Sequence, residues 1–326
     1  MKQIRWGIAG PGDIAEKFAR AVKNVEGAHV AAVASRSEER GKAFAEKFGI
    51  EHVFTGYEAM AESDVVDAVY VCTPQRFHFP CSELFLKNGK HVLCEKPLCV
   101  NTNQILSLQG IAKEKNLFLM EAMWTRFLPA INEAKSIIAS GEIGEVRGVE
   151  ADFSFGIPKE ANPKLFDVSL AGGATLDVGV YSLTFASIFL GDDYEKLYAV
   201  SDVKEGVDLH TAVLIKYKDG VIASLSAGIG LKKPEGAYIY GTKGHVFVPA
   251  FFGARELFVT VGGKVRNIKK PPVGGGFEEE IIEACNCIRA GKSESDVMPI
   301  EQSIRIARQM DEIRRQIGVR YDFAGE

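Results

Sequence analysis

The strongest constraint on the fold is an alternation of short apolar segments with amphipathic ones over about the first 120 residues of this 326-residue chain. Apolar runs such as 4–10, 29–35 and 67–74 are too continuous for strands that keep one face in water. The segments between them carry apolar residues at helical spacing, and two of them end at Gly49 and Gly89. Strands that are buried on both faces and joined by helices predict a doubly wound parallel sheet.

After about residue 140 the pattern changes, because strand-like segments follow one another without helices between them. These predicted strands are 146–155, 197–203, 211–217, 221–230, 237–242 and 256–263. The sequence Lys-Asp-Gly at 218–220 and the pair Gly262-Gly263 predict tight hairpins, so neighbouring strands should pair antiparallel. The helices predicted in this part of the chain cover about 175–190, 277–290 and 301–317.

The change of pattern predicts two domains, with a boundary near residue 122. The first domain, residues 1–122, should be an α/β domain, and the second, residues 123–326, an α+β domain with a largely antiparallel open sheet. No Gly/Ser-rich linker separates them, which indicates two closely associated domains.

Composition excludes several classes of protein. Lys and Arg number 39 against 43 Asp and Glu, and the net charge of −4 gives no sign of a nucleic-acid or anionic-membrane partner. No apolar run approaches the roughly 20 residues that span a bilayer, and the N-terminal segment lacks the apolar core of a signal peptide. We therefore expect a cytoplasmic protein that binds neither membranes nor nucleic acid.

Cysteine spacing predicts neither a disulfide framework nor a metal site. The chain has six cysteines, and only Cys285 and Cys287 are close in sequence, as C-x-C without a second pair at zinc spacing. Reduced thiols in a cytoplasmic protein are the expectation, with no metal.

A glycine-rich turn follows the first predicted strand and opens the first predicted helix. It reads G-P-G-D-I-A at residues 10–15. Gly10 would allow the tight turn, and Gly12 would let the backbone approach a pyrophosphate, which the helix N-terminus also attracts. This strand–turn–helix context raises the motif above a chance match. It predicts a dinucleotide-binding (Rossmann) domain, with Asp13 and Ile14 also beside the cofactor.

The end of the second predicted strand bears on which dinucleotide fits. An NAD site places Asp or Glu there, about 20 residues after the glycines, to bind the ribose 2′-hydroxyl. This chain has Ser35 and Arg36, with Arg40 one turn later. A hydroxyl and guanidinium groups suit a 2′-phosphate, so we expect NADP(H) to be preferred and NAD(H) to be possible. Glu38 and Glu39 fit the acidic first turn of a helix.

The segment H-V-L-C-E-K-P-L at 91–98 is an apolar strand that runs into two charged residues and a proline. In an open parallel sheet, ligands bind beyond the carboxyl ends of the strands. Thr73 and Pro74 end the fourth long segment there, and Glu95 and Lys96 end the fifth. The proline favours an extended backbone at Lys96, which would direct its ammonium toward the ligand. A surface lysine at a strand exit is the alternative.

A second group of candidate residues lies in A-G-G-A-T-L-D-V-G-V-Y-S-L at 171–183. Asp177 and Tyr181 are i and i+4 on a predicted helix, so they share one face. Hydride transfer at an alcohol carbon requires a group that moves the hydroxyl proton, and a lysine nearby would favour a tyrosine phenolate. Asp177 could instead serve only the helix dipole, and Tyr181 could be an ordinary half-buried aromatic residue.

The chain resembles the glucose–fructose oxidoreductase/inositol dehydrogenase family (Gfo/Idh/MocA) over essentially its whole length. The stretches that carry the resemblance, in the family's order, are the glycine turn, T-P-Q-R-F-H-F-P (73–80), E-K-P-L (95–98), G-E-I-G-E-V (141–146) and G-G-A-T-L-D-V-G-V-Y-S-L (172–183). The stretch M-E-A-M-W-T-R-F-L-P (120–129), with the tyrosine at 181, resembles more narrowly the branch of this family that holds dihydrodiol dehydrogenases acting with NADP.

The resemblance implies an oxidoreductase that transfers a hydride between nicotinamide and a CH–OH or carbonyl carbon of a sugar, polyol or cyclic trans-diol. Lys96 matches the family's catalytic lysine, Asp177 its helix aspartate and Tyr181 its acid/base tyrosine. His78 matches a histidine near the nicotinamide, and the Lys96–Pro97 bond is expected to be cis. The cofactor contacts that we expect are Gly10, Gly12, Asp13, Ile14, Ser35, Arg36, Arg40, Thr73, Pro74, His78, Glu95 and Lys96.

Five residues are candidates for the substrate pocket. The candidates are Trp124 and Arg126 at the domain junction, Phe277 directly after a glycine-rich stretch, and the aromatic residues Phe153 and Phe155. Core packing is the alternative role for each aromatic residue. The family relationship also implies a homodimer through the open sheet of the second domain. Two other functions stay open: an aldose or 1,5-anhydrofructose-type reductase, and a dinucleotide-sensing regulatory protein without turnover.

Overall fold

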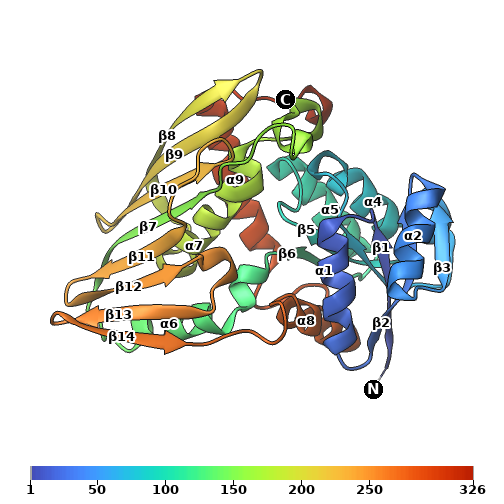
Figure 1. Ribbon diagram of the computed structural model, residues 1–326, viewed down its shortest axis with the longest axis horizontal. Coiled ribbons are helices and arrows are strands. Elements are labelled where there is room, and N and C mark those ends of the chain that lie inside the picture. The colour runs from blue at the N-terminus through green and yellow to red at the C-terminus, as the bar shows by residue number, and fades with distance from the viewer. Residues whose placement is uncertain (1, 326) are drawn as a thin grey trace. The chain divides into compact units, whose positions relative to one another are not determined.

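A computed structural model describes residues 2–325 and divides the chain into two compact units (Figure 1). The first unit runs to Met123 and also includes Val273–Ile304; the second holds Trp124–Pro272 and the residues from Arg305 on. The first division lies within a residue or so of the predicted boundary. The expectation that everything beyond residue 122 forms the second domain is wrong for Val273–Ile304.

The first unit is built on a parallel sheet of six strands, as predicted. Its order is β3-β2-β1-β4-β5-β6, the order of a doubly wound dinucleotide-binding sheet. The strands are β1 (Ile4–Ala9), β2 (Ala28–Ser35), β3 (His52–Thr55), β4 (Ala68–Val71), β5 (His91–Glu95) and β6 (Leu119–Ala122). Since the order reverses between β1 and β4, the carboxyl ends of these two strands border the expected ligand crevice.

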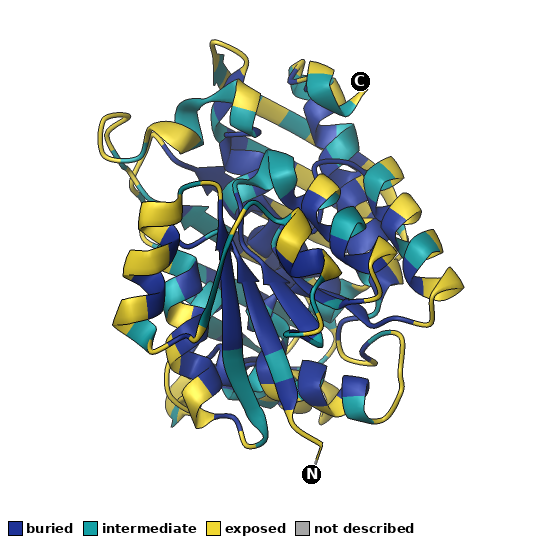
Figure 2. Ribbon diagram, turned by 90° about the vertical axis from the view of Figure 1, so that its right-hand side faces the viewer, coloured by how far each residue is buried: buried dark blue, intermediate teal, exposed yellow. Residues whose placement is uncertain are grey.

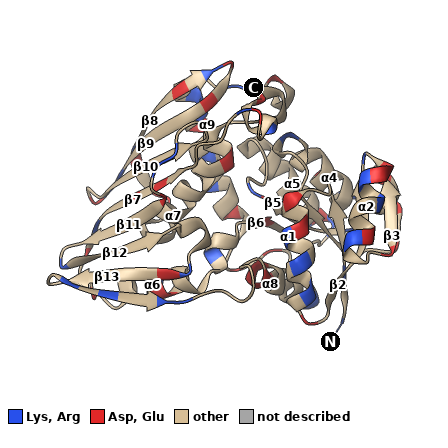
Figure 3. Cartoon of the chain, viewed as in Figure 1, with Lys and Arg blue, Asp and Glu red and all other residues tan. Residues whose placement is uncertain are grey.

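Helices pack against this sheet. They are α1 (Asp13–Ala21), α2 (Glu38–Phe48), the unpredicted α3 (Glu58–Glu62), α4 (His78–Lys87), α5 (Thr102–Glu114) and α8 (Glu278–Arg289), with 3-10 turns η1 (Val22–Asn24) and η2 (Gln75–Phe77). Figure 2 shows the strands as a dark-blue centre flanked by helices that alternate buried and exposed residues. In Figure 3, residues of both charges alternate along α1 and α2.

Helix α8 explains why Val273–Ile304 belongs to the first unit. Its apolar face, which includes Ile281 and Ala284, is fully buried. At its end, Arg289 donates hydrogen bonds to the backbone oxygens of Lys2, at 3.0 Å, and Gly27, at 2.8 Å. The helical period of 277–290 was readable from the sequence, but an apolar stripe does not specify which sheet it covers.

The second unit is built on an eight-stranded sheet in the order β14-β13-β12-β11-β7-β10-β9-β8. The strands are β7 (Val146–Ser154), β8 (Tyr194–Lys204), β9 (Val207–Tyr217), β10 (Ile222–Gly228), β11 (Gly236–Gly241), β12 (Gly244–Pro249), β13 (Glu256–Val261) and β14 (Lys264–Lys269). The sequence did not predict β12 and β14. The largely antiparallel sheet is confirmed, with one parallel pair, β7 and β10.

Pairing around β7 differs from the expectation for neighbouring strands. The chain neighbours β10 and β11 do not pair with each other, because both pair with β7, which lies between them. Residues 229–235, which connect them, contain Pro234 and no two-residue hairpin signal. The predicted hairpins at Gly220 and at Gly262-Gly263 are present, and these glycines have positive φ angles.

The remaining helices belong to the second unit or enter it. They are η3 (Trp124–Phe127), α6 (Pro129–Ala139), η4 (Pro163–Phe166), η5 (Val168–Leu170), the π-helical η6 (Thr175–Gly179), α7 (Val180–Leu190), η7 (Phe251–Gly253), α9 (Ile300–Ile317) and η8 (Asp322–Ala324). The stretch Val168–Leu190 is long and apolar enough to cross a membrane by composition, contrary to expectation. However, 78% of its most apolar window is buried inside the fold, as in a core helix.

Candidate active site

The turn between β1 and α1 has the geometry that its glycines predict. Gly10 has φ +98°, and a Cβ there would lie 3.2 Å from the backbone oxygen of Cys72, so no larger residue fits without strain. At Gly12 the backbone is extended, and a Cβ would meet nothing within 4 Å. No side chain caps the first turn of α1. An open backbone cradle with uncapped N–H groups therefore fits the pyrophosphate of a dinucleotide.

The end of β2 supplies polar groups beside this cradle. Ser35 is buried, and its hydroxyl accepts a hydrogen bond from the backbone N–H of Ser37 at 3.2 Å. Arg40 donates to the backbone oxygen of Pro11 at 2.8 Å, which ties α2 to the glycine turn. The turn thus has a guanidinium fixed directly beside it.

Two further arginines meet over one aromatic ring. The guanidinium carbon of Arg36 lies 5.3 Å from the ring centroid of Phe77, and that of Arg76 lies 5.6 Å from it. Arg76 was not singled out from the sequence, although it lies in the 73–80 motif just beyond β4. The ends of β2 and β4 therefore form a cationic cluster on one aromatic platform.

His78 connects the ends of two strands. Its Nε2 lies 2.9 Å from the backbone oxygen of Thr73, and its Nδ1 lies 2.8 Å from that of Pro97. The ring is buried, and burial lowers the pKa of His78 to about 4, although the two carbonyl oxygens raise it. Since both ring nitrogens face backbone oxygens, the side chain fixes the loops after β4 and β5.

Lys96 follows β5 at the carboxyl edge of the sheet and is half-buried. Its peptide bond to Pro97 is cis, as expected. Its backbone N–H donates to the Glu95 carboxylate at 3.1 Å. The lysine backbone is therefore held on both sides, by Glu95 and by the proline that His78 contacts.

The side chain of Glu95 is engaged inside the first unit. It is buried and accepts a hydrogen bond from the hydroxyl of Tyr70. Burial raises the pKa of Glu95, while Lys96 and Tyr70 lower it. The Glu95 carboxylate is thus bound to Tyr70 and to the backbone of Lys96, and its predicted cofactor contact stays a prediction.

In the second unit, Tyr181 lies in the first turn of α7 and is 7% exposed. The indole Nε1 of Trp124 donates to its hydroxyl at 3.1 Å. The ring of Phe153 meets it edge-on, with centroids 5.4 Å apart. The tyrosine hydroxyl is therefore oriented by a hydrogen bond and its ring by packing.

Trp124 and Phe153, two of the predicted pocket residues, contact this tyrosine, and two more adjoin them. Phe155 lies 5.9 Å from Phe153 between ring centroids, and Arg126 shares the η3 turn with Trp124. Phe252, which the sequence did not point to, stacks on Phe153 at 3.8 Å. Its signal was weak because it follows β12, a strand that was not predicted.

Phe277 has a different setting. It lies in the first unit, at the start of α8, and the ammonium of Lys17 lies 6.0 Å from its ring centroid. It does not belong to the aromatic group of the second unit. The glycine-rich stretch before it suggested a pocket, but Glu278 accepts hydrogen bonds from the backbone of Gly275 and Gly276 and so fixes this stretch.

Asp177 lies in a π-helical turn that runs directly into α7. The predicted helix is therefore continuous, but Thr175–Gly179 has i→i+5 geometry. Such π-helical turns are rare in proteins, and those that occur are often found at functional sites. Asp177 is half-buried, and its backbone N–H donates to the oxygen of Gly173 at 3.2 Å. Asp177 and Tyr181 thus lie on one helical segment.

Two family models match the chain. Residues 4–123 match the "Oxidoreductase family, NAD-binding Rossmann fold" model, and residues 131–247 match the "GFO/IDH/MocA C-terminal domain" model. The chain belongs to the Gfo/Idh/MocA family. Like its relatives it is an oxidoreductase, and its first unit carries the NAD(P)-binding fold.

Relatives of this Gfo/Idh/MocA protein cover nearly its whole length. Trans-1,2-dihydrobenzene-1,2-diol dehydrogenase of Mus musculus is 34% identical over 330 residues, which is 98% of each chain. A 3-ketoreductase from Actinomadura kijaniata, solved with TDP-benzene and NADP, is 30% identical with a TM-score of 0.86 over 97% of this chain and 98% of its own. An aldose-aldose oxidoreductase from Caulobacter crescentus has a TM-score of 0.88 over 97% of each chain, and its 23% identity shows the shared fold.

The sequence did not point to one buried acidic residue of the first unit, Glu280. Glu280 is fully buried, and neither carboxylate oxygen has a hydrogen-bond partner among the described residues. Burial raises the pKa of Glu280 well above its ordinary value, and the charges of Glu95 and Glu279 raise it further. The run E-E-E at 278–280 resembles an ordinary acidic first turn, so only the fold reveals the burial.

Replacing Glu280 by methionine is expected to stabilise the protein at alkaline pH. The pKa of Glu280 is higher in the folded protein than in the unfolded chain. As the pH rises from the unfolded pKa through the folded pKa, the unfolded chain loses this proton first, so the wild type loses stability over that range. Removing an unpartnered buried polar group should gain about 1–3 kcal/mol at pH 8, and less at pH 5. Chemical denaturation at both pH values measures the difference. The exposed Glu46, changed to methionine, is the control, and an equal effect at both pH values would contradict the assignment.

Proposed function

We propose that this protein is an NADP-dependent oxidoreductase that transfers a hydride between nicotinamide and a CH–OH or carbonyl carbon of a sugar, polyol or cyclic trans-diol. The observation that carries the proposal is Lys96, fixed at the carboxyl edge of a sheet whose β1–α1 turn is an open phosphate cradle. The names of the relatives, a diol dehydrogenase and a 3-ketoreductase, support chemistry at a CH–OH or carbonyl carbon.

Arginines support NADP over NAD. Arg36 and Arg76 flank Phe77, and Arg40 is tied to the glycine turn. Position 35 is a serine, so no carboxylate there repels a 2′-phosphate. The Actinomadura kijaniata relative was solved with NADP, which agrees with this preference.

Each catalytic residue has a role that its chemistry suits. When bound, the nicotinamide supplies the two-electron acceptor or donor. Lys96 carries the positive charge that polarises the reacting oxygen, and Tyr181, oriented by Trp124, moves its proton. Asp177 positions the substrate or the tyrosine from the preceding helical turn.

Replacing Arg36 by alanine tests the cofactor preference. Loss of a charge-assisted contact with a 2′-phosphate should weaken NADPH binding by about 10- to 100-fold and leave NADH binding nearly unchanged. Fluorescence titration with each cofactor measures this. The control is Arg20→Ala, since Arg20 is an exposed residue of α1 paired with Glu16. Equal losses for the two cofactors would contradict the 2′-phosphate role.

The reaction itself is tested by the appearance of reduced-nicotinamide absorbance with NADP⁺ across trans-dihydrodiols, aldoses and inositols, with NAD⁺ beside it. We expect a signal on a diol or an aldose with NADP⁺. A signal only in the reductive direction, on an aldose or an anhydrosugar ketone, would favour a reductase of the same family. Tight NADPH binding with silence across the panel would favour a dinucleotide sensor and contradict turnover.

We further propose a cytoplasmic homodimer. The outer face of β8, β9 and β10 exposes Tyr198, Val200, Leu214 and Ile222, each more than half exposed. Tyr198 and Leu214 face each other across β8 and β9, so the apolar side chains are contiguous. A second copy of the chain would cover them, and the molecular mass of the protein in solution tests this.

All six cysteines are free, and reduced thiols support the proposed cytoplasmic location, which is a reducing compartment.

A further inference from the structure

A buried aspartate on the neighbouring strand binds the start of the helix that carries Asp177 and Tyr181. Asp208, on β9, is fully buried. Its Oδ2 accepts from the backbone N–H of Thr175 at 2.7 Å and from the Thr175 hydroxyl at 2.6 Å. The hydroxyl of Thr211 lies 2.9 Å from the same oxygen. A carboxylate from outside the helix thus satisfies donors of its first turn, where a negative charge is favoured.

The chain leaves room for this carboxylate. Gly173 has φ +136°, and a Cβ there would lie 2.1 Å from Oδ1 of Asp208. Oδ1 itself has no hydrogen-bond partner among the described residues. The second glycine of the Gly172-Gly173 pair is therefore needed because the aspartate occupies the space of a side chain.

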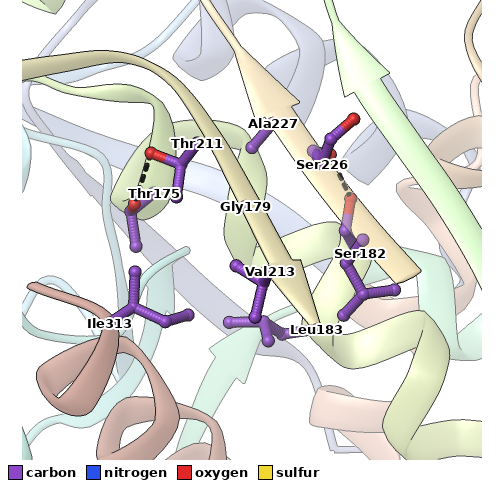
Figure 4. A pocket seen from close by; sticks show the side chains of 10 residues that line it. Thr175, Gly179, Ser182, Leu183, Thr211, Val213, Ser226, Ala227 and Ile313 are labelled. Carbon is purple, nitrogen blue, oxygen red and sulfur yellow. Dashed lines mark hydrogen bonds between the residues drawn. The ribbon is translucent and has the colours of Figure 1, made fainter. Parts of the chain in front are cut away.

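Polar groups also line the buried face of this helical segment, beside a small cavity. Figure 4 shows Thr175 and Thr211 pointing toward each other beside Gly179, with Ser182 directed at Ser226 on the other side. The cavity between them has a volume of about 10 Å³, enough for one water molecule. Ser182 donates to the backbone oxygen of Ser226 at 3.0 Å. Polar contacts at Thr175 and at Ser182 therefore hold this segment in addition to its apolar packing.

We propose that Asp208 is a positioning residue of the active site, which fixes the register of the helix from Thr175 to Leu190 and so the placement of Asp177 and Tyr181. It touches no reacting atom, and it acts through Thr175. The expected effect on turnover rests on the proposed function, but the role of Asp208 in placing the helix does not depend on turnover. Asparagine at 208 would present an N–H₂ group or a single weaker acceptor to three donors.

Three variants measure the effect on catalysis. Asp208→Asn should lower kcat by about 10- to 100-fold, as other changes to groups that orient catalytic residues do. Thr175→Val removes one donor and should lower kcat by less, and Thr175→Ser keeps both donors and should match the wild type. Affinity for NADPH should stay within about 2-fold, because Asp208 lies in the second unit and the phosphate cradle in the first.

The helix position has a reporter that needs no turnover. Trp124 donates its indole N–H to Tyr181, and the chain's other tryptophan, Trp6, is buried in the first unit. In a nitrogen–proton NMR spectrum, Asp208→Asn and Thr175→Val should shift the Trp124 indole resonance and leave that of Trp6 in place. Thr175→Ser should shift neither. If the wild-type protein turned over none of the substrates, the proposed function would be contradicted, but this NMR test of the helix position could still be carried out.

The proposal fails if Asp208→Asn keeps both kcat and the Trp124 resonance of the wild type. If that variant does not fold, Thr175→Val and Thr211→Val decide the question, since each removes a single donor to the carboxylate. An unshifted Trp124 resonance in both of these folded variants would also overturn it. A shift confined to Trp124, together with a lower kcat at unchanged NADPH affinity, supports it.

Discussion

Replacing Lys96 by methionine should lower kcat by about 10³-fold while NADPH still binds, because one charged group that stabilises developing negative charge is lost. Methionine keeps the length and the apolar stem of the side chain. The contacts that fix the backbone, from Lys96 N–H to Glu95 and from Pro97 to His78, do not involve the ammonium. The cradle at Gly10 and Gly12 is likewise untouched.

The measurement pairs steady-state turnover with an NADPH titration. Lys87→Met is the matched control, since Lys87 lies in the last turn of α4 and is exposed and paired with Glu83. It should behave as the wild type. Undiminished turnover in Lys96→Met would end the proposed mechanism, and loss of both turnover and NADPH binding would assign the lysine to the cofactor instead.

Replacing Tyr181 by phenylalanine should lower kcat by about 10²- to 10⁴-fold, the usual range for loss of a general acid or base. The ring contacts with Phe153 and Phe252 are kept, so the fold should survive. What disappears is the hydroxyl to which Trp124 donates. KM should change much less than kcat, because the group is needed for proton movement.

Tyr217→Phe is the control for this variant. Tyr217 is also buried in the second unit, and its hydroxyl has no hydrogen-bond partner among the described residues. Steady-state kinetics of both variants should show a large fall in kcat for Tyr181→Phe alone. Similar values of kcat in the two variants would rule out Tyr181 as the proton carrier.

Local patterns made much of the first unit predictable. The glycine turn, the strand that ends just before Lys96 and the apolar segments of the parallel sheet are each specified by about ten consecutive residues. Gly10 has the positive φ that a tight turn needs, and the bond before Pro97 is cis. These features depend on neighbouring residues and on the order of the elements.

Contacts between distant residues were not predictable. Asp208 meets Thr175 across 33 positions, and Arg76 and Arg36 reach the same ring because β2 and β4 lie on either side of β1 in the sheet. Nothing in the helical period of 277–290 indicates that α8 packs in the first unit. The directions of side chains were also not predictable from the sequence: Glu95 points into the core, and His78 faces two backbone oxygens.

Transfer of deuterium from the reacting carbon of a labelled diol or aldose to the cofactor tests the proposed reaction most directly. Mass spectrometry of the NADPH formed should show one added deuterium with the wild type, and no labelled NADPH with Lys96→Met. Oxidised product with the deuterium lost to water would contradict hydride transfer. NADP⁺ that binds tightly yet is never reduced by any substrate would contradict an enzyme and favour a sensor.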